Sequence, residues 1–422
     1  GRAAGVSVTQ NSGAPGGGIS VSIRGINSLN GNEPLYVIDG VAISGNTDGN
    51  SSVLSSINPS DIVSMEILKD ASATAIYGSR ASNGVVLITT NQGKAGKTKV
   101  SYEGYYGLQQ LPKKLDVLNL REYAEYQNLR AQVLGFGDRE EFKDPSLLGE
   151  GTNWQDEIFQ TAFITNNNIS ITGASPKHSF YLGVGYSHEQ GNIKHEKFSK
   201  VTINASNDYK ITDFLKVGFQ FNGARTLPAD SKQVLGALRA APIAPVYNKE
   251  YGLYSVLPEF QKAQINNPMV DVDLKANTTK AENYRASGNI YGEVDFLKHF
   301  NFKAMFSMDY CLLYTSDAAD DGRTYLPIMK VYDDTAAGDV VTLGTGKTEV
   351  SQFKENETKV QSDYLLTYTN SFDHGNHNLT ATAGFTTYYN SLSRLDGARK
   401  QGVGLVIPDD PDKWFVSIGD AA

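Results

Sequence analysis

The sequence has 422 residues, enough for one large domain or roughly two to three of ordinary size. Its formal net charge of −8 argues against a nucleic-acid partner, because binding phosphates requires clustered Lys and Arg. The single cysteine excludes an internal disulfide framework, and no apolar run reaches the roughly 18 residues that a transmembrane helix needs.

Up to residue 90 the pattern predicts a compact mixed α/β domain. Residues 1–22 hold two short alternating runs around a Gly-rich segment, which predicts strand, loop, strand. Residues 35–38 form an apolar strand that ends in a turn at Asp39 and Gly40. Residues 62–68 alternate and residues 85–90 are rich in β-branched side chains, so both are predicted as strands.

One helix and one exposed loop are predicted in the same domain. Asp70 is placed to cap a short helix over residues 71–77, because its carboxylate can accept the free N–H groups of the first turn. Gly78 ends that helix, since glycine adopts a positive φ without strain. The Asn/Gly/Ser-rich residues 44–52 are predicted as an exposed loop.

After a Gly-rich hinge at residues 93–96, apolar and polar side chains alternate in one segment after another. The segments scatter in length around the roughly ten residues that a tilted strand needs to cross a bilayer. The predicted strands are residues 100–109, 163–174, 180–187, 201–206, 215–222, 290–296, 302–309, 358–371 and 379–385.

Short and long connections alternate along this part of the chain. Those near residues 175, 213, 298 and 374 are tight, whereas residues 226–282 and 311–355 are long. Short turns at one end and long loops at the other are typical of bacterial outer-membrane barrels. A soluble β-sandwich also alternates, but its loops are usually more even in length.

Helices are predicted within the connections. Residues 118–134 form an amphipathic helix, 153–159 a shorter one, and 231–241 a third that ends at Pro242. Trp154 either packs in a core or stacks on a sugar ring. Residues 311–321 contain the only cysteine and interrupt the strand pattern like foreign sequence, so we expect no function there.

Catalytic and metal-binding arrangements are not found. His374 and His377 lie in a predicted tight turn without partners at ligand spacing. Asp409, Asp410 and Asp412 could recruit Ca²⁺ in a loop but lack the spacing of an EF-hand. We therefore expect no enzyme, no metal centre and no cofactor.

Several N-terminal motifs together resemble the plug domain of TonB-dependent outer-membrane transporters. They are Ile23-Arg24-Gly25, residues 35–40 ending in Asp39-Gly40, Ile57-Asn58-Pro59 and residues 68–80. The continuation through residues 81–90 resembles the SusC-like (RagA-type) branch of Bacteroidota. The family motif falls on Arg24, Gly25, Asp39, Gly40, Lys69, Asp70, Tyr77, Gly78, Arg80 and Gly84.

The resemblance implies an α/β plug domain followed by an antiparallel transmembrane β-barrel. Residues 1–95 would be the plug, shortened at its N-terminus, and residues 98–422 the first part of the barrel, shortened at its C-terminus. Family barrels have about 22 strands, and this chain would supply about nine. We expect the chain to lack its signal peptide and TonB-box segment and to be inactive by itself.

The resemblance also implies a function, which is active import of oligosaccharides or peptides across the outer membrane. The expected partners are a SusD-like surface lipoprotein, the TonB–ExbB–ExbD complex and outer-membrane lipid, with the plug in the barrel lumen and long loops outside. Tyr247, Tyr251 and Tyr254 are loop candidates for stacking on cargo, although packing within the loop is the commoner role for aromatic side chains.

The alternative is a secreted or surface-exposed β-rich adhesion protein with an α/β cap. The two hypotheses differ in where the apolar side of each strand faces. A closed apolar core indicates the soluble protein, and an outward apolar face indicates the transporter.

Overall fold

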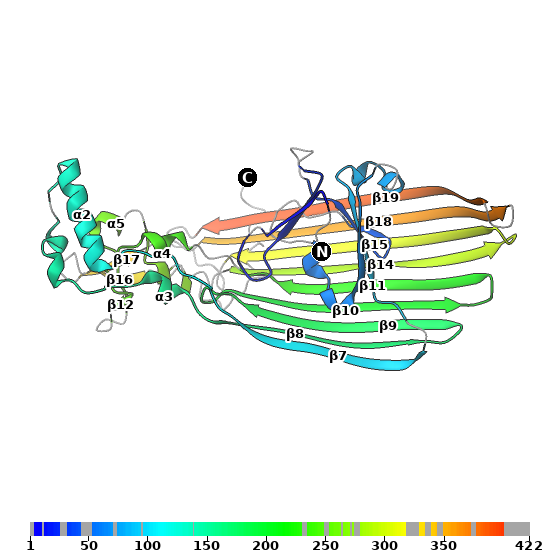
Figure 1. The fold of residues 1–422 in the computed structure, drawn as a ribbon, viewed down its shortest axis with the longest axis horizontal. Helices are drawn as coiled ribbons and strands as arrows, with labels where there is room; N and C mark the ends of the chain where they lie inside the picture. The colour runs from blue at the N-terminus through cyan, green and yellow to red at the C-terminus, as the bar shows by residue number, and fades with distance from the viewer. Residues whose placement is uncertain are drawn as a thin grey trace.

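The computed structural model describes most of the chain. The described residues are 4–10, 12–25, 32–43, 53–70, 74–93, 96–137, 139–229, 234–248, 253–262, 265–270, 272–273, 279–317, 329–333, 339–343, 349–372 and 377–400. They form an N-terminal domain (residues 4–93), a nine-stranded sheet, and a group of helices and short strands at one end of that sheet (Figure 1).

The N-terminal domain consists of a hairpin and a four-stranded sheet. The hairpin pairs β1 (Val6–Gln10) with β2 (Ile19–Ile23). The sheet has the order β4-β3-β6-β5, in which β3 and β6 are parallel and the other pairs antiparallel. Its elements are β3 (Leu35–Ile38), β4 (Val41–Ile43), η1 (Val53–Ser56), η2 (Pro59–Asp61), β5 (Ile62–Leu68), η3 (Ala75–Ala81) and β6 (Val85–Thr90).

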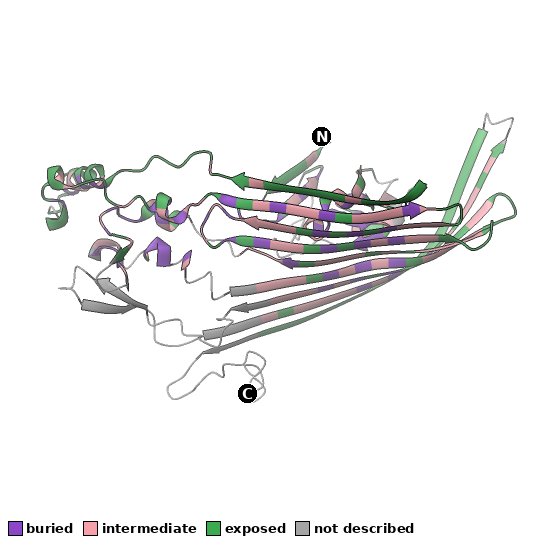
Figure 2. Cartoon of the chain, turned by 90° about the horizontal axis from the view of Figure 1, so that it is seen from below, coloured by how far each residue is buried: buried purple, intermediate pink, exposed green. Residues whose placement is uncertain are grey.

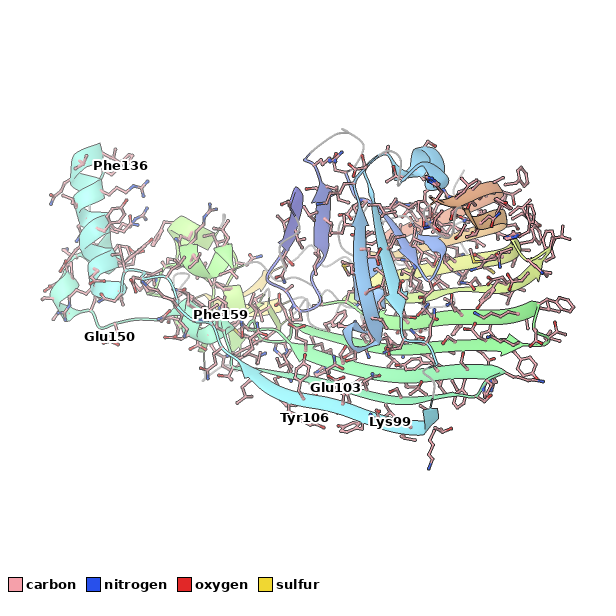
Figure 3. The ribbon with its side chains drawn as sticks, turned by 45° about the vertical axis from the view of Figure 1, so that its right-hand side comes forward. Lys99, Glu103, Tyr106, Phe136, Glu150 and Phe159 are labelled. Atoms are coloured by element: carbon pink, nitrogen blue, oxygen red, sulfur yellow. The ribbon has the colours of Figure 1, made fainter. Side chains whose placement is uncertain are left out.

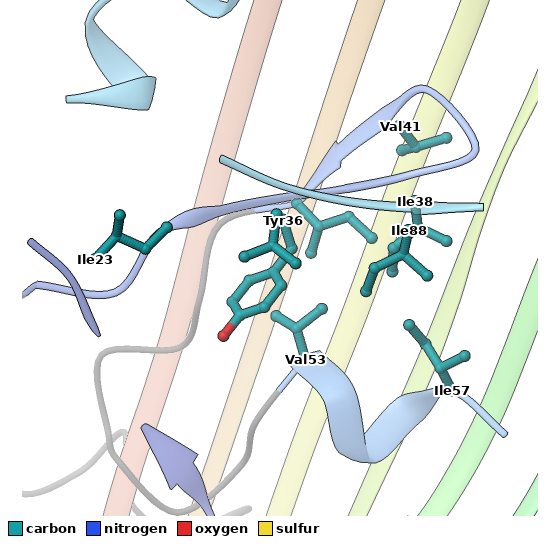
Figure 4. Packing of buried hydrophobic residues seen from close by; sticks show 9 residues of the cluster. Ile23, Tyr36, Ile38, Val41, Val53, Ile57 and Ile88 are labelled. Atoms are coloured by element: carbon teal, nitrogen blue, oxygen red, sulfur yellow. The ribbon is translucent and has the colours of Figure 1, made fainter. Parts of the chain in front are cut away.

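The core of this domain lies on both faces of β3, whose four residues are all buried. A strand covered on both faces needs a continuous apolar run, which is what residues 35–38 supply. On one face Tyr36 and Ile38 pack with Val53 and Ile88 (Figure 4). The turn predicted after β3 is confirmed, with φ of 50° at Asp39 and 88° at Gly40.

The helix predicted over residues 71–77 is described from Thr74 onward, and the Thr74 N–H donates to the Asp70 carbonyl at 3.0 Å, as in a helical turn. The described helix, η3, is a 3-10 helix that begins at Ala75 and continues past Gly78 to Ala81. Gly78, with a φ of 62°, is a non-helical kink between two short helical turns, so it ends the first of them as predicted. The Asp70 carboxylate binds Arg24, and residues 71–73, whose N–H groups it was predicted to cap, lie outside the described residues, as do residues 44–52.

The large sheet is antiparallel throughout, and its strands follow one another in chain order. Nine strands match the number expected, counted over the described residues. They are β7 (Gly96–Gln109), β8 (Ala162–Ala174), β9 (His178–Gln190), β10 (Lys197–Lys210), β11 (Leu215–Leu227), β14 (Thr279–Phe296), β15 (Phe300–Asp317), β18 (Glu349–Phe372) and β19 (His377–Lys400).

The expected break at Cys311 is wrong for the described part of residues 311–321. β15 continues to Asp317 and stays paired with β14 and β18 along that length. Residues 318–321 lie outside the described residues.

Long connections gather at the end of the sheet opposite the tight turns (Figure 1). Their helices are α2 (Leu120–Leu134), η4 (Glu140–Phe142), η5 (Pro145–Leu147), α3 (Trp154–Ile158), α4 (Leu235–Arg239) and α5 (Glu259–Lys262). Their strand pairs are β12 (Tyr247–Asn248) with β13 (Leu253–Tyr254) and β16 (Met329–Asp333) with β17 (Asp339–Leu343). Of the helices that the structure describes, none is long and apolar enough to cross a membrane.

The connections β7–β8 (residues 110–161) and β11–β14 (residues 228–278) pack into one unit, which we call the loop body. Trp154 is buried there, and its Nε1 donates to the Ala241 carbonyl at 3.1 Å, so its packing role is confirmed. The predicted helix 231–241 is shorter than expected, since α4 spans only five described residues. Phe136 lies at the tip of α2, and Phe159 lies where the loop body joins the sheet (Figure 3).

Candidate functional site

The nine-stranded sheet has its polar side chains buried and its apolar side chains exposed. Buried and exposed positions alternate along its central strands (Figure 2). The buried set is Asn168, Thr202, Asn204, Ser206, Arg285, Ser287, Asn289, Ser307, Asp309, Lys359, Gln361 and Asp363. The exposed set on the opposite face includes Ile169, Leu182, Val184, Val201, Ile203, Phe219, Phe221, Ile290, Phe302, Phe306 and Met308. This is the reverse of a soluble sandwich, and it argues against the adhesion alternative.

The polar face is covered by the N-terminal domain along one row of register partners, which we call the polar rung. Each residue of the row lies directly opposite the next across adjacent strands. The polar rung is Lys99, Thr172, Tyr181, Ser206, Gln220, Asn289, Ser307, Gln361 and Tyr388.

The first contact of the polar rung is between Tyr181 of β9 and Asp61 of η2. The Tyr181 hydroxyl donates to Asp61 Oδ1 at 2.5 Å, and both residues are buried. Burial raises the pKa of the Asp61 carboxyl, while hydrogen bonds from Tyr181 and Asn168 act against the rise. Next along the rung, the Ser206 hydroxyl donates to the Asn91 carbonyl at 3.4 Å. These bonds fix the edge of the domain that carries η2 and the end of β6.

The second contact is at the turn after β3. The Asn289 amide donates to the Asp39 carbonyl at 2.8 Å, and Asn222 donates to its carboxylate at 3.5 Å. Within the domain, the backbone N–H and hydroxyl of Thr90 donate to the same carboxylate at 2.8 and 2.6 Å. Burial raises the pKa of the Asp39 carboxyl, and the hydrogen bonds from Thr90 and Asn222 oppose that rise. Asp39 therefore joins β3, β6 and the sheet.

The third contact is made by Arg80, at the end of the row. Its Nη2 donates to Gln361 Oε1 at 3.1 Å, and its guanidinium lies 4.1 Å from the centre of the Tyr388 ring. This geometry combines a hydrogen bond with a cation–π contact. Nearby, burial raises the pKa of the Tyr77 hydroxyl, and the negative charge of Asp363 adds to the effect.

Glycine on the sheet permits close approach of the domain. A Cβ at Gly185 would overlap the side-chain amide of Asn58, and one at Gly183 would lie 3.0 Å from Asp61 Oδ1. Lys200 of β10 reaches the Ile57 carbonyl at 3.0 Å beside them. The Asn58–Asp61 segment thus fits against backbone that has no side chain in the way.

The motif residues of the N-terminal domain do not form one cluster. Asp39, Gly40 and Arg80 lie against the sheet, with Gly40 next to Met305. Arg24 and Asp70 form an exposed ion pair at 2.5 Å, away from the polar rung.

The remaining motif residues serve the domain itself. Lys69 donates to the Ala4 carbonyl. Gly25 and Gly84 have φ of 92° and 89°, and a Cβ at Gly84 would crowd Ile23. Their roles are local backbone geometry rather than contact with the sheet.

The structure describes the surroundings of two of the three loop tyrosines that were candidates for stacking on cargo. Tyr247 and Tyr254 contact edge to face with ring centres 5.4 Å apart, and the Tyr254 hydroxyl donates to Asp273. Tyr254 packs on the loop-body core, whereas Tyr247 is exposed. Tyr251 lies outside the described residues.

Sequence reasoning did not identify Tyr181, Asn222, Asn289 or Gln361 as functional. The signal that could have found them is that polar residues recur on one side of successive strands. Within the described residues, no cluster of three or more His, Cys, Asp and Glu could hold a metal ion. Asp409, Asp410, Asp412 and His374 fall outside them.

Comparison with known proteins gives similarities that cover up to 95% of the chain. Residues 1–85 match the family model described as the TonB-dependent Receptor Plug Domain. The TonB-dependent receptor SusC of Bacteroides thetaiotaomicron is 42% identical over 259 residues, covering 59% of this chain and 25% of that protein. The TonB-dependent receptor P3 of Formosa agariphila is 32% identical over 402 residues, covering 92% of this chain and 36% of that protein.

A solved structure shares the fold over nearly all of the chain. The RagAB peptide importer in its "open-open" state aligns with a TM-score of 0.75 at 24% identity, covering 95% of this chain and 46% of that one. The ferric citrate transporter FecA aligns with a TM-score of 0.56 at 9% identity, covering 94% and 44%. This chain therefore spans about half of these solved chains and a smaller share of the two receptors above.

A plug domain packed on the polar face of a partial antiparallel barrel defines the class as TonB-dependent receptors. Within that class, the relatives support the SusC/RagA-like group that the N-terminal motifs predicted. These relatives are named as receptors and transporters rather than enzymes.

Proposed function

We propose that this chain forms the plug and part of the barrel wall of an outer-membrane importer driven by the TonB–ExbB–ExbD complex. The observation that carries the proposal is the sheet with an exposed apolar face and a polar face that holds the N-terminal domain. An apolar outer band suits lipid, and hydrogen bonds can hold a plug yet be exchanged with water when it moves.

The cargo is an oligosaccharide or a peptide. These are the two cargo classes that the resemblance to the SusC-like branch implies. SusC has the higher identity of the two receptors described above, and the structural neighbour RagAB is named as a peptide importer. We propose that cargo meets the protein at the loop body, which lies outside the cell, and that a SusD-like lipoprotein covers the same end. Residues 1–95 would be the plug, and the barrel would begin near residue 98.

Uptake by cells tests this function. The whole gene in which this sequence occurs, rather than the 422-residue polypeptide alone, is expressed in a Bacteroidota host from which the neighbouring importers have been deleted, and uptake of labelled oligosaccharides and labelled peptides is compared. We expect energy-dependent uptake of one of these classes and outer-membrane localisation. Uptake that persists without TonB, or a protein recovered from the soluble fraction, would contradict the proposal.

A further inference from the structure

The connection between β9 and β10, residues 191–196, touches both the loop body and the N-terminal hairpin. From these contacts we propose that it is a mechanical link through which a change in the loop body alters the β1–β2 hairpin. The proposal concerns coupling within the molecule rather than import. It rests on the proposed function only for the role that such coupling would have in the cell.

On the loop-body side, the link is held by backbone hydrogen bonds and by burial. Ile193 packs in the apolar cluster of Trp154 and forms an isolated β-bridge with Phe159. The Lys194 N–H donates to the Ile158 carbonyl at 2.9 Å. The Gln160 N–H donates to the Asn192 carbonyl at 2.7 Å. Residues 192–194 therefore follow any shift of the segment 158–160.

His195 fastens the link to the second connection of the loop body. Its Nε2 lies 2.8 Å from Asp273 Oδ1, and the Tyr254 hydroxyl donates to the other oxygen of that carboxylate. His195 has a φ of 68°, a conformation that non-glycine residues adopt at a cost. Because the His195–Asp273 pair is partly exposed, it is weak enough to open and close.

On the hairpin side, the chain around the link packs closely against the loop between β1 and β2, and a glycine lies at each of two close contacts. Gly16, in the loop between β1 and β2, has a φ of 63°, and a Cβ there would overlap the Phe198 ring. The Gly16 N–H also donates to the Glu189 carboxylate. A Cβ at Gly191 would lie 3.2 Å from Pro15 Cδ. The tip of the hairpin thus rests on Gly191 of the link and on Glu189 and Phe198, the strand residues that flank the link.

The rest of the N-terminal domain is held differently. Asp39, Asp61 and Arg80 are bound to the polar rung, and all three lie outside the hairpin. Movement of the link therefore acts on the hairpin, while the polar rung keeps the four-stranded sheet in place. Contiguous packing of this kind is a physical route for coupling, and a coupling free energy can be measured.

Amide hydrogen exchange on the full chain in detergent tests the link. His195→Ala removes the contact with Asp273, and Asp273→Asn weakens it while keeping the side chain's size. We expect exchange in β1 and β2 to rise by about fivefold or more in either variant, the lower end of typical allosteric coupling. The matched control is His299→Ala, because His299 is an exposed histidine at the turn end of the sheet. It should leave the hairpin unchanged.

Phe198→Ala supplies the reciprocal test, since coupling between two sites acts in both directions. It should raise exchange in the hairpin and also in residues 158–160. Faster exchange in the loop body with an unchanged hairpin in both His195→Ala and Asp273→Asn would overturn the proposal. Exchange is independent of uptake, so an intact link in a protein that imports nothing would contradict only the proposed function.

Discussion

A carboxylate buried beneath the sheet depends on a donor from the sheet. Asp61 is 2% exposed, and the Tyr181 hydroxyl binds it at 2.5 Å. A buried acceptor that loses its partner costs the full desolvation of the group, which is more than the hydrogen bond itself contributes. The strength of the contact between domain and sheet therefore depends on single residues.

Tyr181→Phe removes this donor and keeps the ring. We expect the opening free energy of η2 and β5, measured by hydrogen exchange, to fall by about 1 to 3 kcal/mol. Tyr186→Phe is the control, because Tyr186 is on the same strand but on the exposed face. Equal effects of the two substitutions would show that the Tyr181–Asp61 bond does not hold the domain.

The same carboxyls predict a pH dependence. The pKa values of Asp61 and Asp39 are raised, chiefly by burial. A carboxyl with a raised folded-state pKa contributes stability that is complete below its unfolded pKa, roughly 4, and is lost as pH rises through the folded value. The opening free energy of the domain should therefore decrease from about pH 4 toward neutral, after correction for intrinsic exchange rates. Asp61→Asn should flatten this slope, and a slope that is unchanged in that variant would assign it to other groups.

At the scale of elements, alternation predicted the strands well where one face is apolar. β5 and β6 have the bounds expected, and every predicted segment of the large sheet lies within an observed strand. β14 begins at Thr279 rather than near residue 290. Its early outward positions include Glu282, Ala286 and Gly288, so the apolar signal is missing where the strand extends toward the loop body.

The polar rung could not be predicted, because it depends on register. Asn289 and Gln361 become neighbours of Ser307 only after three strands pair, and nothing local in the sequence sets that pairing. The motif pointed to Asp39 and Arg80, but their partners on the sheet are far away in sequence.

A charge on the outer face of a strand tests whether that face meets lipid. Ile203 lies near the middle of β10, and Tyr209 is on the same face close to the turn. Ile203→Arg should reduce the folding free energy in vesicles by about 2 to 4 kcal/mol, and Tyr209→Arg by about 1 or less. Folding titrations in urea with lipid vesicles measure both values. Equal costs at the two positions would argue against a bilayer around β10.

The close approach of Asn58 to Gly185 of β9, the strand beside β10, gives another prediction. Gly185→Ala places a methyl group against Asn58. We expect this overpacking to reduce the free energy that holds the N-terminal domain on the sheet by about 1 to 3 kcal/mol. Gly292→Ala is the control, because nothing lies within 4 Å of a Cβ there. Protease susceptibility of the N-terminal domain in intact membranes reports the difference. Cleavage at the same rate in both variants would place Asn58 away from the strand.

At the scale of the whole molecule, the nine-stranded sheet has polar groups in two places that need partners, its two edge strands and its polar face. In the described residues β7 pairs only with β8 and β19 only with β18, so two rows of backbone groups lack strand partners. Such groups cannot remain unpaired in hydrocarbon, because no water is available to them. The polar side chains of the polar rung also need hydrogen-bond partners, and the N-terminal domain supplies these in place of water.

We therefore expect the 422-residue polypeptide, expressed by itself, not to form a sealed barrel, because its edges β7 and β19 require strand partners. Closed barrels resist unfolding in SDS at room temperature and migrate differently after boiling, so gel mobility before and after heating measures closure. The polypeptide should show one mobility and should not produce stable single-channel conductance in a planar bilayer. A heat-sensitive band would mean that β7 and β19 pair with each other or with a second copy. Cross-linking through cysteines placed at residues 105 and 386, on the two edge strands, would then distinguish a closed monomer from an oligomer.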